Sequence, residues 1–379
     1  MKHLLSFATC AALCALLSLP LCANDGVYYV SGNQLFPMQE TDISVRKEIL
    51  TISLGDDGMA DVDVYYEFFN NGPAKRLLMG FEADAPYNAS APFSKKGIHP
   101  YIHDFSVTMN GNPLTHSNGV YAKSHGNAPE PLDLKKWKIQ EPYTEDMLYN
   151  AELDSATCFS YVYKFDAHFS HGLNVVHHTY RYNMSMSVCT LFSVYYKLTP
   201  AARWAGQKIG DFTLLIKAPN TAKHFLVDMK PFSDHEFEVT EGAGKIRKAD
   251  RPYYTNMAEI SLRNGTIRWH ATDFRPTEEL TIHSADLIME MEGSPFVLGC
   301  FYDRSKGYRP ELCHFMDGKP LDARILRNLP YAHRGYVFRD KTLAEYFCRL
   351  WWYMPDPSWK ASTKDFTPQE LQFIKKAAK

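Results

Sequence analysis

The sequence lacks the short motifs that mark many well-known catalytic sites. It contains no H-E-x-x-H zinc motif, no G-x-S-x-G nucleophile elbow, no P-loop and no G-x-G-x-x-G between a strand and a helix. Gly242-Ala243-Gly244-Lys245 carries only part of a P-loop and lies among strand patterns, so it indicates a turn. We therefore expect a protein that is not an enzyme and needs no cofactor.

After residue 21 the sequence also lacks an apolar run long enough to cross a membrane. Its first 23 residues combine a short basic start, the apolar run Leu4–Leu21 and a polar stretch after Ala23, the pattern of a secretory signal peptide cleaved after Ala23. Acylation of Cys22 is the alternative, but Leu21 stands where that signal takes a small residue. We expect a soluble extracytoplasmic bacterial protein, periplasmic or secreted, with no transmembrane segment after cleavage.

Only five of the eight cysteines follow the predicted cleavage site. Cys300 and Cys313 flank a turn-like D-R-S-K-G cluster, so a hairpin would place them opposite each other, and a disulfide there would stabilise by about 3 kcal/mol. Cys158 and Cys189 are likewise symmetric about a turn signal. In an oxidising compartment these spacings predict two disulfides. Cys348 flanks a helical apolar stripe, and we expect it to be buried rather than reactive.

Most of the chain between Val27 and Met291 shows strand patterns. Asp61–Phe68 and Tyr180–Val188 alternate apolar and polar residues, which is typical of half-buried strands. Asn110-Gly111 and Asn264-Gly265 are hairpin-turn signals, because both residue types tolerate positive φ. A composition of 45% hydrophobic and 14% aromatic residues supports a sizeable core. Together these features predict a mainly β protein with an antiparallel β-sandwich body.

The last 60 residues change to helical patterns. Asp340 is a good N-cap, and an apolar stripe at helical spacing follows it: Leu343, Tyr346, Phe347, Leu350 and Trp351. Gly335 just upstream predicts a helix end or a tight turn. Thr367-Pro368-Gln369-Glu370 has the residues of a capping box with proline at N1, so a last helix should begin there.

The motif Tyr331-Ala332-His333-Arg334-Gly335, followed by Tyr336-Val337-Phe338 and later by Trp352-Tyr353-Met354-Pro355, resembles the YARHG domain of secreted bacterial proteins over about residues 320–379. Here His333 and Arg334 stand in exchanged order relative to the family's Tyr-Ala-Arg-His-Gly. Pro330 stands where the family continues a helix, so we expect the helix to break there. The resemblance implies a small helical domain, extracellular and binding the cell envelope, without an assigned activity.

The preceding part, roughly residues 24–290, resembles an exported bacterial domain of unknown function that precedes YARHG modules. The residues that carry this resemblance are Asn24-Asp25, Asp61–Gly72, Phe105–Gly111 and Trp204–Phe212. We expect five segments: a signal peptide at 1–23, a β-sandwich domain at 24–293, a long loop at about 113–150 inside it, a hairpin connector at 294–319 and the helical domain at 320–379.

The helical domain is also the basic part of the chain. Residues 322–379 hold 11 Lys and Arg against 6 Asp and Glu, whereas the rest of the chain after Ala23 carries a net charge of −8. This asymmetry favours an anionic partner for the tail, and an exported chain does not point to nucleic acid.

The same domain supplies aromatic and basic side chains that can stack on sugars and pair with carboxylates. The candidate binding residues are Tyr331, His333, Arg334, Tyr336, Trp351, Trp352 and Tyr353, with Trp352 and Arg334 expected to be exposed. Peptidoglycan or another anionic envelope polymer, or an envelope protein, would be the partner. The alternative use of these rings is a core, because a domain of about 60 residues needs most of its aromatics inside.

Two other functions remain open from the sequence. Asp166, His168 and His171 cluster at a predicted hairpin tip and could hold zinc or copper, although strand alternation places only Asp166 and His168 on one face. Scattered His, Asp and Glu could also assemble the site of an envelope hydrolase. We favour the non-catalytic binding protein, because no spacing in the sequence indicates a hydrolytic site.

Overall fold

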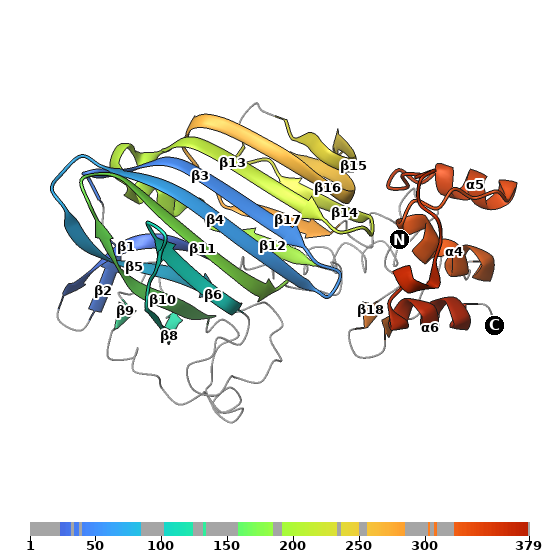
Figure 1. The fold of residues 1–379 in the computed structure, drawn as a ribbon, viewed down its shortest axis with the longest axis horizontal. Helices are drawn as coiled ribbons and strands as arrows, with labels where there is room; N and C mark the ends of the chain where they lie inside the picture. The colour runs from blue at the N-terminus through green and yellow to red at the C-terminus, as the bar shows by residue number, and fades with distance from the viewer. Residues whose placement is uncertain are drawn as a thin grey trace, which may run out of the picture.

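The computed structural model describes residues 23–31, 34–37, 40–84, 102–123, 132–133, 158–184, 192–232, 236–249, 256–284, 302–303, 307–308 and 322–377. These residues form a large sheet, a smaller sheet packed beneath part of it, and a group of C-terminal helices at one end of the large sheet (Figure 1). The predicted mainly β architecture with a helical C-terminus is confirmed.

The smaller sheet has six strands in the order β8-β10-β5-β1-β2-β9, all paired antiparallel. Its strands are β1 (Ala23–Ser31), β2 (Gln34–Pro37), β5 (Lys75–Asp84), β8 (His116–Lys123), β9 (Leu132–Asp133) and β10 (Cys158–Phe169). Two of them, β8 and β9, lie in the segment 113–150 that we expected to be a loop. The composition of that segment gives little strand signal, and β8 obtains its structure by pairing along β10.

The large sheet has eleven strands. They are β3 (Ile43–Leu54), β4 (Met59–Asn70), β6 (Ile102–Met109), β7 (Asn112–Pro113), β11 (Gly172–Asn183), β12 (Ser193–Tyr196), β13 (Ile209–Ala218), β14 (Lys223–Asp228), β15 (Glu238–Lys248), β16 (Met257–Phe274) and β17 (Leu280–Ser284). β3 and β13 run parallel, so this sheet is mixed where the sequence predicted an antiparallel one.

The two Asn-Gly signals have different outcomes. Asn110 and Gly111, with φ of 52° and 79°, turn the chain between β6 and β7 as predicted. The predicted hairpin at Asn264-Gly265 is wrong, because both residues lie inside the continuous 18-residue strand β16. Asn264 has φ of 44°, and a Cβ on Gly265 would lie 2.4 Å from the Glu241 carbonyl oxygen. The pair therefore permits a local kink and a close approach to β15 rather than a chain reversal.

The two sheets share one core. On β4 the predicted inward face is buried, from Val62 at 2% exposure to Phe68 at 1%. Across the layer Phe81 of the small sheet meets Tyr180 of the large sheet, with ring centroids 4.8 Å apart. Phe68 and Phe169 pair across the same layer at 5.5 Å. Each such buried side chain contributes on the order of 1.5–3 kcal/mol. The body is thus a β-sandwich over the part of the large sheet that the small sheet covers.

The C-terminal helices are α4 (Ala323–His333), α5 (Lys341–Cys348), the short η4 (Thr363–Asp365) and α6 (Pro368–Lys376). Both predicted helix starts are confirmed: Asp340 accepts from the Leu343 N–H at 3.0 Å, and Thr367 forms a complete capping box with Glu370. The predicted break at Pro330 is wrong, since α4 continues to His333. Proline removes one backbone hydrogen bond, and here its ring is buried in the helical core, which compensates.

Between the body and the helices, β18 (Tyr302–Asp303) and β19 (Gly307–Tyr308) pair antiparallel inside the predicted connector 294–319. Cys189, Cys300 and Cys313 lie outside the described residues, and Cys158 opens β10 without a described side chain, so both disulfides stay predictions. Cys348 is free and exposed, which corrects our expectation of burial. Among the helices that the structure describes, none is both long and apolar enough to span a membrane.

Candidate functional site on the C-terminal helices

The motif residues 331–335 end helix α4. Gly335 has φ of 81°, its N–H donates to the Ala332 carbonyl at 2.9 Å, and the Tyr336 N–H donates to the Tyr331 carbonyl at 3.0 Å. These two bonds form a Schellman motif, which explains the glycine. A Cβ at this position would also lie 2.6 Å from the Met354 carbonyl oxygen. The turn therefore brings the end of α4 against the segment around Met354.

Arg334 points into the helical domain. Its guanidinium contacts both carboxylate oxygens of Glu370 at 2.8 and 2.9 Å, and Nη1 also donates to the Pro330 carbonyl at 3.0 Å. The guanidinium carbon lies 4.6 Å from the centre of the Phe366 ring. Both charged residues are only 4% exposed. Our expectation that Arg334 is exposed is wrong, because a carboxylate 36 residues later neutralises it inside the domain.

His333 and Trp352 are buried as well, at 8% and 3% exposure, with ring centroids 4.8 Å apart. Burial, followed by the nearby positive charges of Arg334 and Lys223, lowers the pKa of His333 to about 3. Its imidazole is therefore neutral at physiological pH. The expected exposure of Trp352 is also wrong, because its ring packs against His333, Phe347 and Tyr353 inside the helical domain.

The joint between the helices and the body is formed by residues 351–356, a turn at 351–352 followed by irregular chain, which contact side chains of β15 and β16. Lys245 Nζ donates to the carbonyls of Trp351 and Tyr353 at 2.8 and 3.0 Å. Ser261 Oγ donates to the carbonyl of Trp352, the residue between these two, at 3.1 Å. Arg263 lies 3.4 Å from both the residue-354 carbonyl and the Asp356 carboxylate. Side chains of the body thus bind four successive main-chain carbonyls of the tail.

A clamp on Trp351 completes the joint. The guanidinium carbon of Arg247 lies 4.3 Å from the centre of the indole, and the His224 ring lies at 5.4 Å. Glu259 holds both clamp residues, with Arg247 Nε at 2.6 Å and His224 Nε2 at 2.8 Å. Burial opposes ionisation of Glu259, but the hydrogen bonds and charges of these two partners outweigh it and hold its pKa at about 2. A buried, ionised carboxylate therefore orients the clamp.

The body side of this joint was not found by sequence reasoning. Lys245 belongs to the Gly242–Lys245 stretch, which we predicted to be a turn and which is part of β15. Its role depends on carbonyls more than 100 residues away. Nothing in the sequence pairs these residues, so no local signal could have identified them.

Tyr331, Tyr336 and Trp359 form a chain of rings on the helical domain, and each ring keeps part of its surface in solvent. We call these three residues the outer aromatic patch. Tyr336 contacts Tyr331 and Trp359 with centroid separations of 5.9 and 6.2 Å. The buried Phe366 lies beneath, 4.7 Å from Tyr331 and 6.5 Å from Trp359. Tyr353, by contrast, is buried and donates its hydroxyl to the Tyr336 carbonyl at 2.5 Å.

Sequence reasoning missed Trp359. It is a single tryptophan in a polar stretch between Asp356 and Asp365, and a large ring in such a loop is the signal that could have shown it. The structure thus divides the seven predicted binding residues. Tyr331 and Tyr336 lie in the patch, whereas the other five, His333, Arg334, Trp351, Trp352 and Tyr353, belong to the domain core or to the joint.

The family comparison agrees with this geometry: the YARHG domain family matches residues 309–379. The chain carries a YARHG domain. No curated protein matches the sequence.

Among solved structures, one from Legionella pneumophila, provisionally described as a nutrient binding protein, is 16% identical. That match covers 95% of this chain and 100% of the other, with a TM-score of 0.47. An M1 zinc metallopeptidase from Deinococcus radiodurans is 10% identical over 65% of this chain and 44% of its own, with a TM-score of 0.26. At these sequence identities and TM-scores, the function named for either protein is not assigned to this chain.

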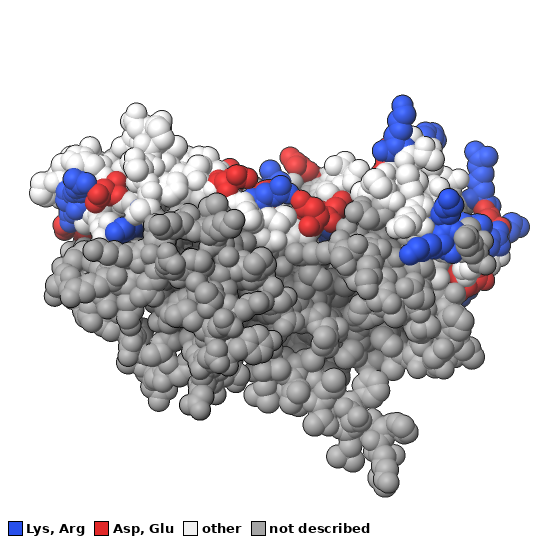
Figure 2. All heavy atoms as spheres, turned by 90° about the horizontal axis from the view of Figure 1, so that it is seen from below, with Lys and Arg blue, Asp and Glu red and all other residues white. Residues whose placement is uncertain are grey.

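The surface of the YARHG domain is basic. Nine of the ten Lys and Arg residues in 322–377 are exposed, and only Arg334 is buried. Because Arg334 and Glu370 neutralise each other inside, nine cations face five acidic residues on the remainder of the domain. Figure 2 shows Lys and Arg side chains projecting at the end of the molecule that carries the helices. Lys360 follows the patch residue Trp359 in the chain, and Lys364 stands two positions before the buried Phe366.

The predicted metal residues do not converge. Asp166 pairs with Arg76 at 2.6 Å, and His171 Nδ1 lies 3.1 Å from the Gly72 carbonyl oxygen. His168 is exposed on β10. Across the part of the chain that the structure describes, no three His, Cys, Asp or Glu side chains gather as a metal site would require. The geometry gives the metal alternative no support.

Proposed function

We propose that this protein is a non-catalytic, exported binding protein whose YARHG domain binds an anionic, sugar-bearing polymer of the bacterial envelope. The observation that carries the proposal is the outer aromatic patch. Tyr336 contacts both Tyr331 and Trp359, and all three rings keep part of their surface in solvent. Peptidoglycan is the polymer whose chemistry fits this surface.

Two interactions would contribute to binding. The partly exposed rings can stack on the apolar faces of sugars, as aromatic side chains do at many interfaces. The excess of exposed Lys and Arg attracts the carboxylates of stem peptides from a distance and pairs with them at the surface. Neither interaction requires a catalytic group or a metal ion.

The joint has a separate role in this proposal. Trp351, Trp352 and Tyr353 hold the YARHG domain on β15 and β16 through their rings and carbonyls. Because these contacts leave Tyr331, Tyr336 and Trp359 partly exposed, the outer aromatic patch is available to a partner. A rigid joint also keeps the patch preorganised, which reduces the entropic cost of binding.

Co-sedimentation tests the proposal. Residues 24–379 are mixed with purified peptidoglycan sacculi, with a neutral insoluble glucan as the control polymer, at low and at high salt. The protein should pellet with sacculi at low salt, be partly released at high salt because its exposed charges are screened, and stay soluble with the glucan. Protein that remains in the supernatant with sacculi and with every other envelope fraction at low salt would contradict polymer binding.

A further inference from the structure

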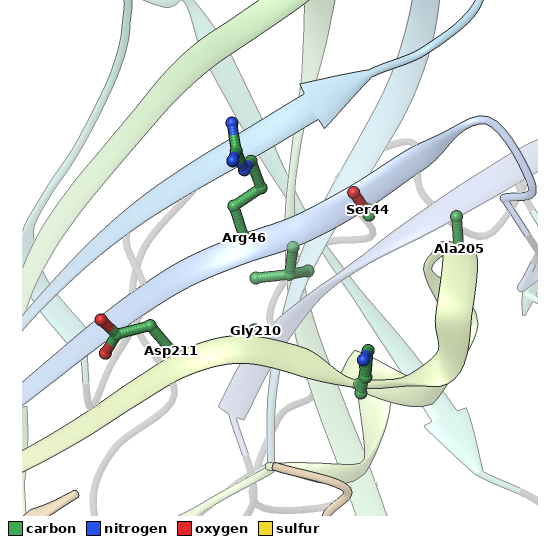
Figure 3. A pocket seen from close by; sticks show the side chains of 7 residues that line it. Ser44, Arg46, Ala205, Gly210 and Asp211 are labelled. Carbon is green, nitrogen blue, oxygen red and sulfur yellow. The ribbon is translucent and has the colours of Figure 1, made fainter. Parts of the chain in front are cut away.

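A second surface feature lies on the sandwich body, where β3 and β13 run parallel. It is a pocket of about 320 Å³ lined by Ser44, Val45, Arg46, Ala205, Lys208, Gly210 and Asp211. Figure 3 shows Arg46 extending from β3, Asp211 from β13 and Ala205 on the facing turn, with Gly210 between them. This volume lies at the lower end of the range for small-molecule sites, so a small ligand would fit.

The sheet is irregular at the floor of this pocket. The pairing of β3 with β4 shifts register between Val45 and Lys47, so Arg46 is an extra, bulged residue. β13 keeps its register on β3 past this bulge, from the Ile209–Val45 pair to the Asp211–Lys47 pair. A Cβ on Gly210 would lie 2.7 Å from the Arg46 carbonyl oxygen, so only glycine fits there. Bulges re-aim side chains and often lie next to binding sites.

The turn that walls the pocket is held in a strained form. Gln207 has φ of 53°, in the region that non-glycine residues rarely adopt, and Gly206 has φ of 80°. Arg275 Nη1 donates to the carbonyl of Gly206 at 2.9 Å and to that of Gln207 at 3.3 Å. Asp273 behind the turn also has φ of 53° and pairs with Lys208 at 2.5 Å. Strain of this kind persists only where surrounding contacts enforce it, and it clusters at ligand sites.

The charges around the pocket are not balanced pair by pair. Lys208 is neutralised by Asp273. Arg46 lies over the Phe69 ring at 5.0 Å and forms no ion pair with any residue that the structure describes. The Asp211 carboxylate lies 3.2 Å from His270 Nε2. Among the described residues, no Lys or Arg pairs with it. Among the described residues, the pocket thus presents one guanidinium without an ion-pair partner and one carboxylate that only a histidine contacts, and a ligand with both charges could bind them.

We propose that this pocket binds a free amino acid or a similarly small zwitterion, with its carboxylate on Arg46 and its ammonium group on Asp211. The planar guanidinium suits two-point binding of a carboxylate. Its contact with Phe69 holds it in place before binding. This site is separate from the outer aromatic patch and does not depend on polymer binding.

Isothermal titration calorimetry of residues 24–379 tests the inference with glycine, alanine, glutamate and diglycine. Alanine amide, which lacks the carboxylate, and N-acetylalanine, which lacks the ammonium group, are the matched analogues. At least one zwitterion should bind, and each analogue should bind at least about tenfold more weakly than alanine, because one charge-assisted contact is lost. No heat from any of the four zwitterions up to roughly millimolar concentrations, or equal binding of the analogues, would overturn the proposal.

Variants separate the pocket from the rest of the surface. Arg46→Gln and Asp211→Asn should each weaken the zwitterion about tenfold or more, and Ala205→Phe should block it by filling the pocket. Lys217→Gln, an exposed charge on the same strand β13, is the control and should leave binding unchanged. Thermal unfolding verifies that each variant is folded. Wild-type affinity in folded Arg46→Gln and Asp211→Asn would refute the assigned site.

Discussion

Arg334 and Glu370 lie 36 residues apart in the chain and form a two-point ion pair inside the YARHG domain, at 2.8 and 2.9 Å. The pair joins the end of α4 to the first turn of α6, where the carboxylate of Glu370 also accepts from the Thr367 N–H at 2.8 Å. One buried contact therefore connects the YARHG motif, the last helix and its capping box.

Breaking this pair should destabilise the domain strongly. Arg334→Met removes the cation and leaves the Glu370 carboxylate buried without its counter-charge, which should lower the free energy of unfolding by about 3–5 kcal/mol. The control is Arg324→Ala, which removes an exposed ion pair with Asp340 and should cost less than about 1 kcal/mol. Urea unfolding followed by circular dichroism measures both. Equal losses in the two variants would contradict the account of the buried pair.

Acid should weaken the folded state through His333. Its pKa is about 3 in the folded protein against an ordinary 6.5, so the unfolded chain binds a proton that the folded chain does not. This contribution to stability is fully present above pH 6.5 and declines as pH falls toward 3. Between pH 7.5 and pH 5 the loss should be about 2 kcal/mol.

The matched variant is His333→Phe, which keeps a ring against Trp352 and cannot titrate. Its free energy of unfolding should fall by about 2 kcal/mol less than that of the natural chain over the same pH range. Glu259, with its pKa lowered from 4.5 to about 2, loses its contribution only below about pH 4.5, so it does not obscure this test. Identical pH profiles for the two proteins would show that His333 is not buried in its neutral form.

The YARHG domain should dissociate from the β-sandwich body when the hydrogen bonds from Lys245 and Arg263 to its main-chain carbonyls are removed. The double variant Lys245→Met and Arg263→Met deletes the donors to the carbonyls of residues 351, 353 and 354. We expect one unfolding transition in calorimetry for the natural chain and two for the double variant, with faster amide exchange in residues 351–356 of the variant. Lys248→Met, an exposed charge at the end of the same strand, should change neither. A single unchanged transition in the double variant would argue against this joint.

The features that the sequence predicted correctly depend on neighbours in the chain. The caps at Asp340 and Thr367 act within three residues, and the inward face of β4 repeats every second residue. The Schellman turn at Gly335 is similarly local. Such signals are fully contained in a short window of sequence.

The features that could not be predicted from the sequence depend on partners distant in the chain. Arg334 is buried because Glu370 is available, and Asn264-Gly265 stays inside a strand because three other strands pair along β16. Trp351 and Trp352 are held by body residues about 90 to 130 positions earlier. The fold class was therefore predictable, whereas the division of aromatics between joint and surface was not.

The central claim is that the outer aromatic patch of the YARHG domain binds an anionic envelope polymer. The most direct test compares sacculus binding by the natural chain and by Trp359→Ala, with Tyr346→Ala as the control, because Tyr346 is a half-buried ring on α5 that packs on Phe347 instead of the patch. After thermal unfolding has shown that both variants are folded, Trp359→Ala should bind at least about fivefold more weakly with an unchanged salt dependence, and Tyr346→Ala should bind normally. Full binding by folded Trp359→Ala would contradict the claim.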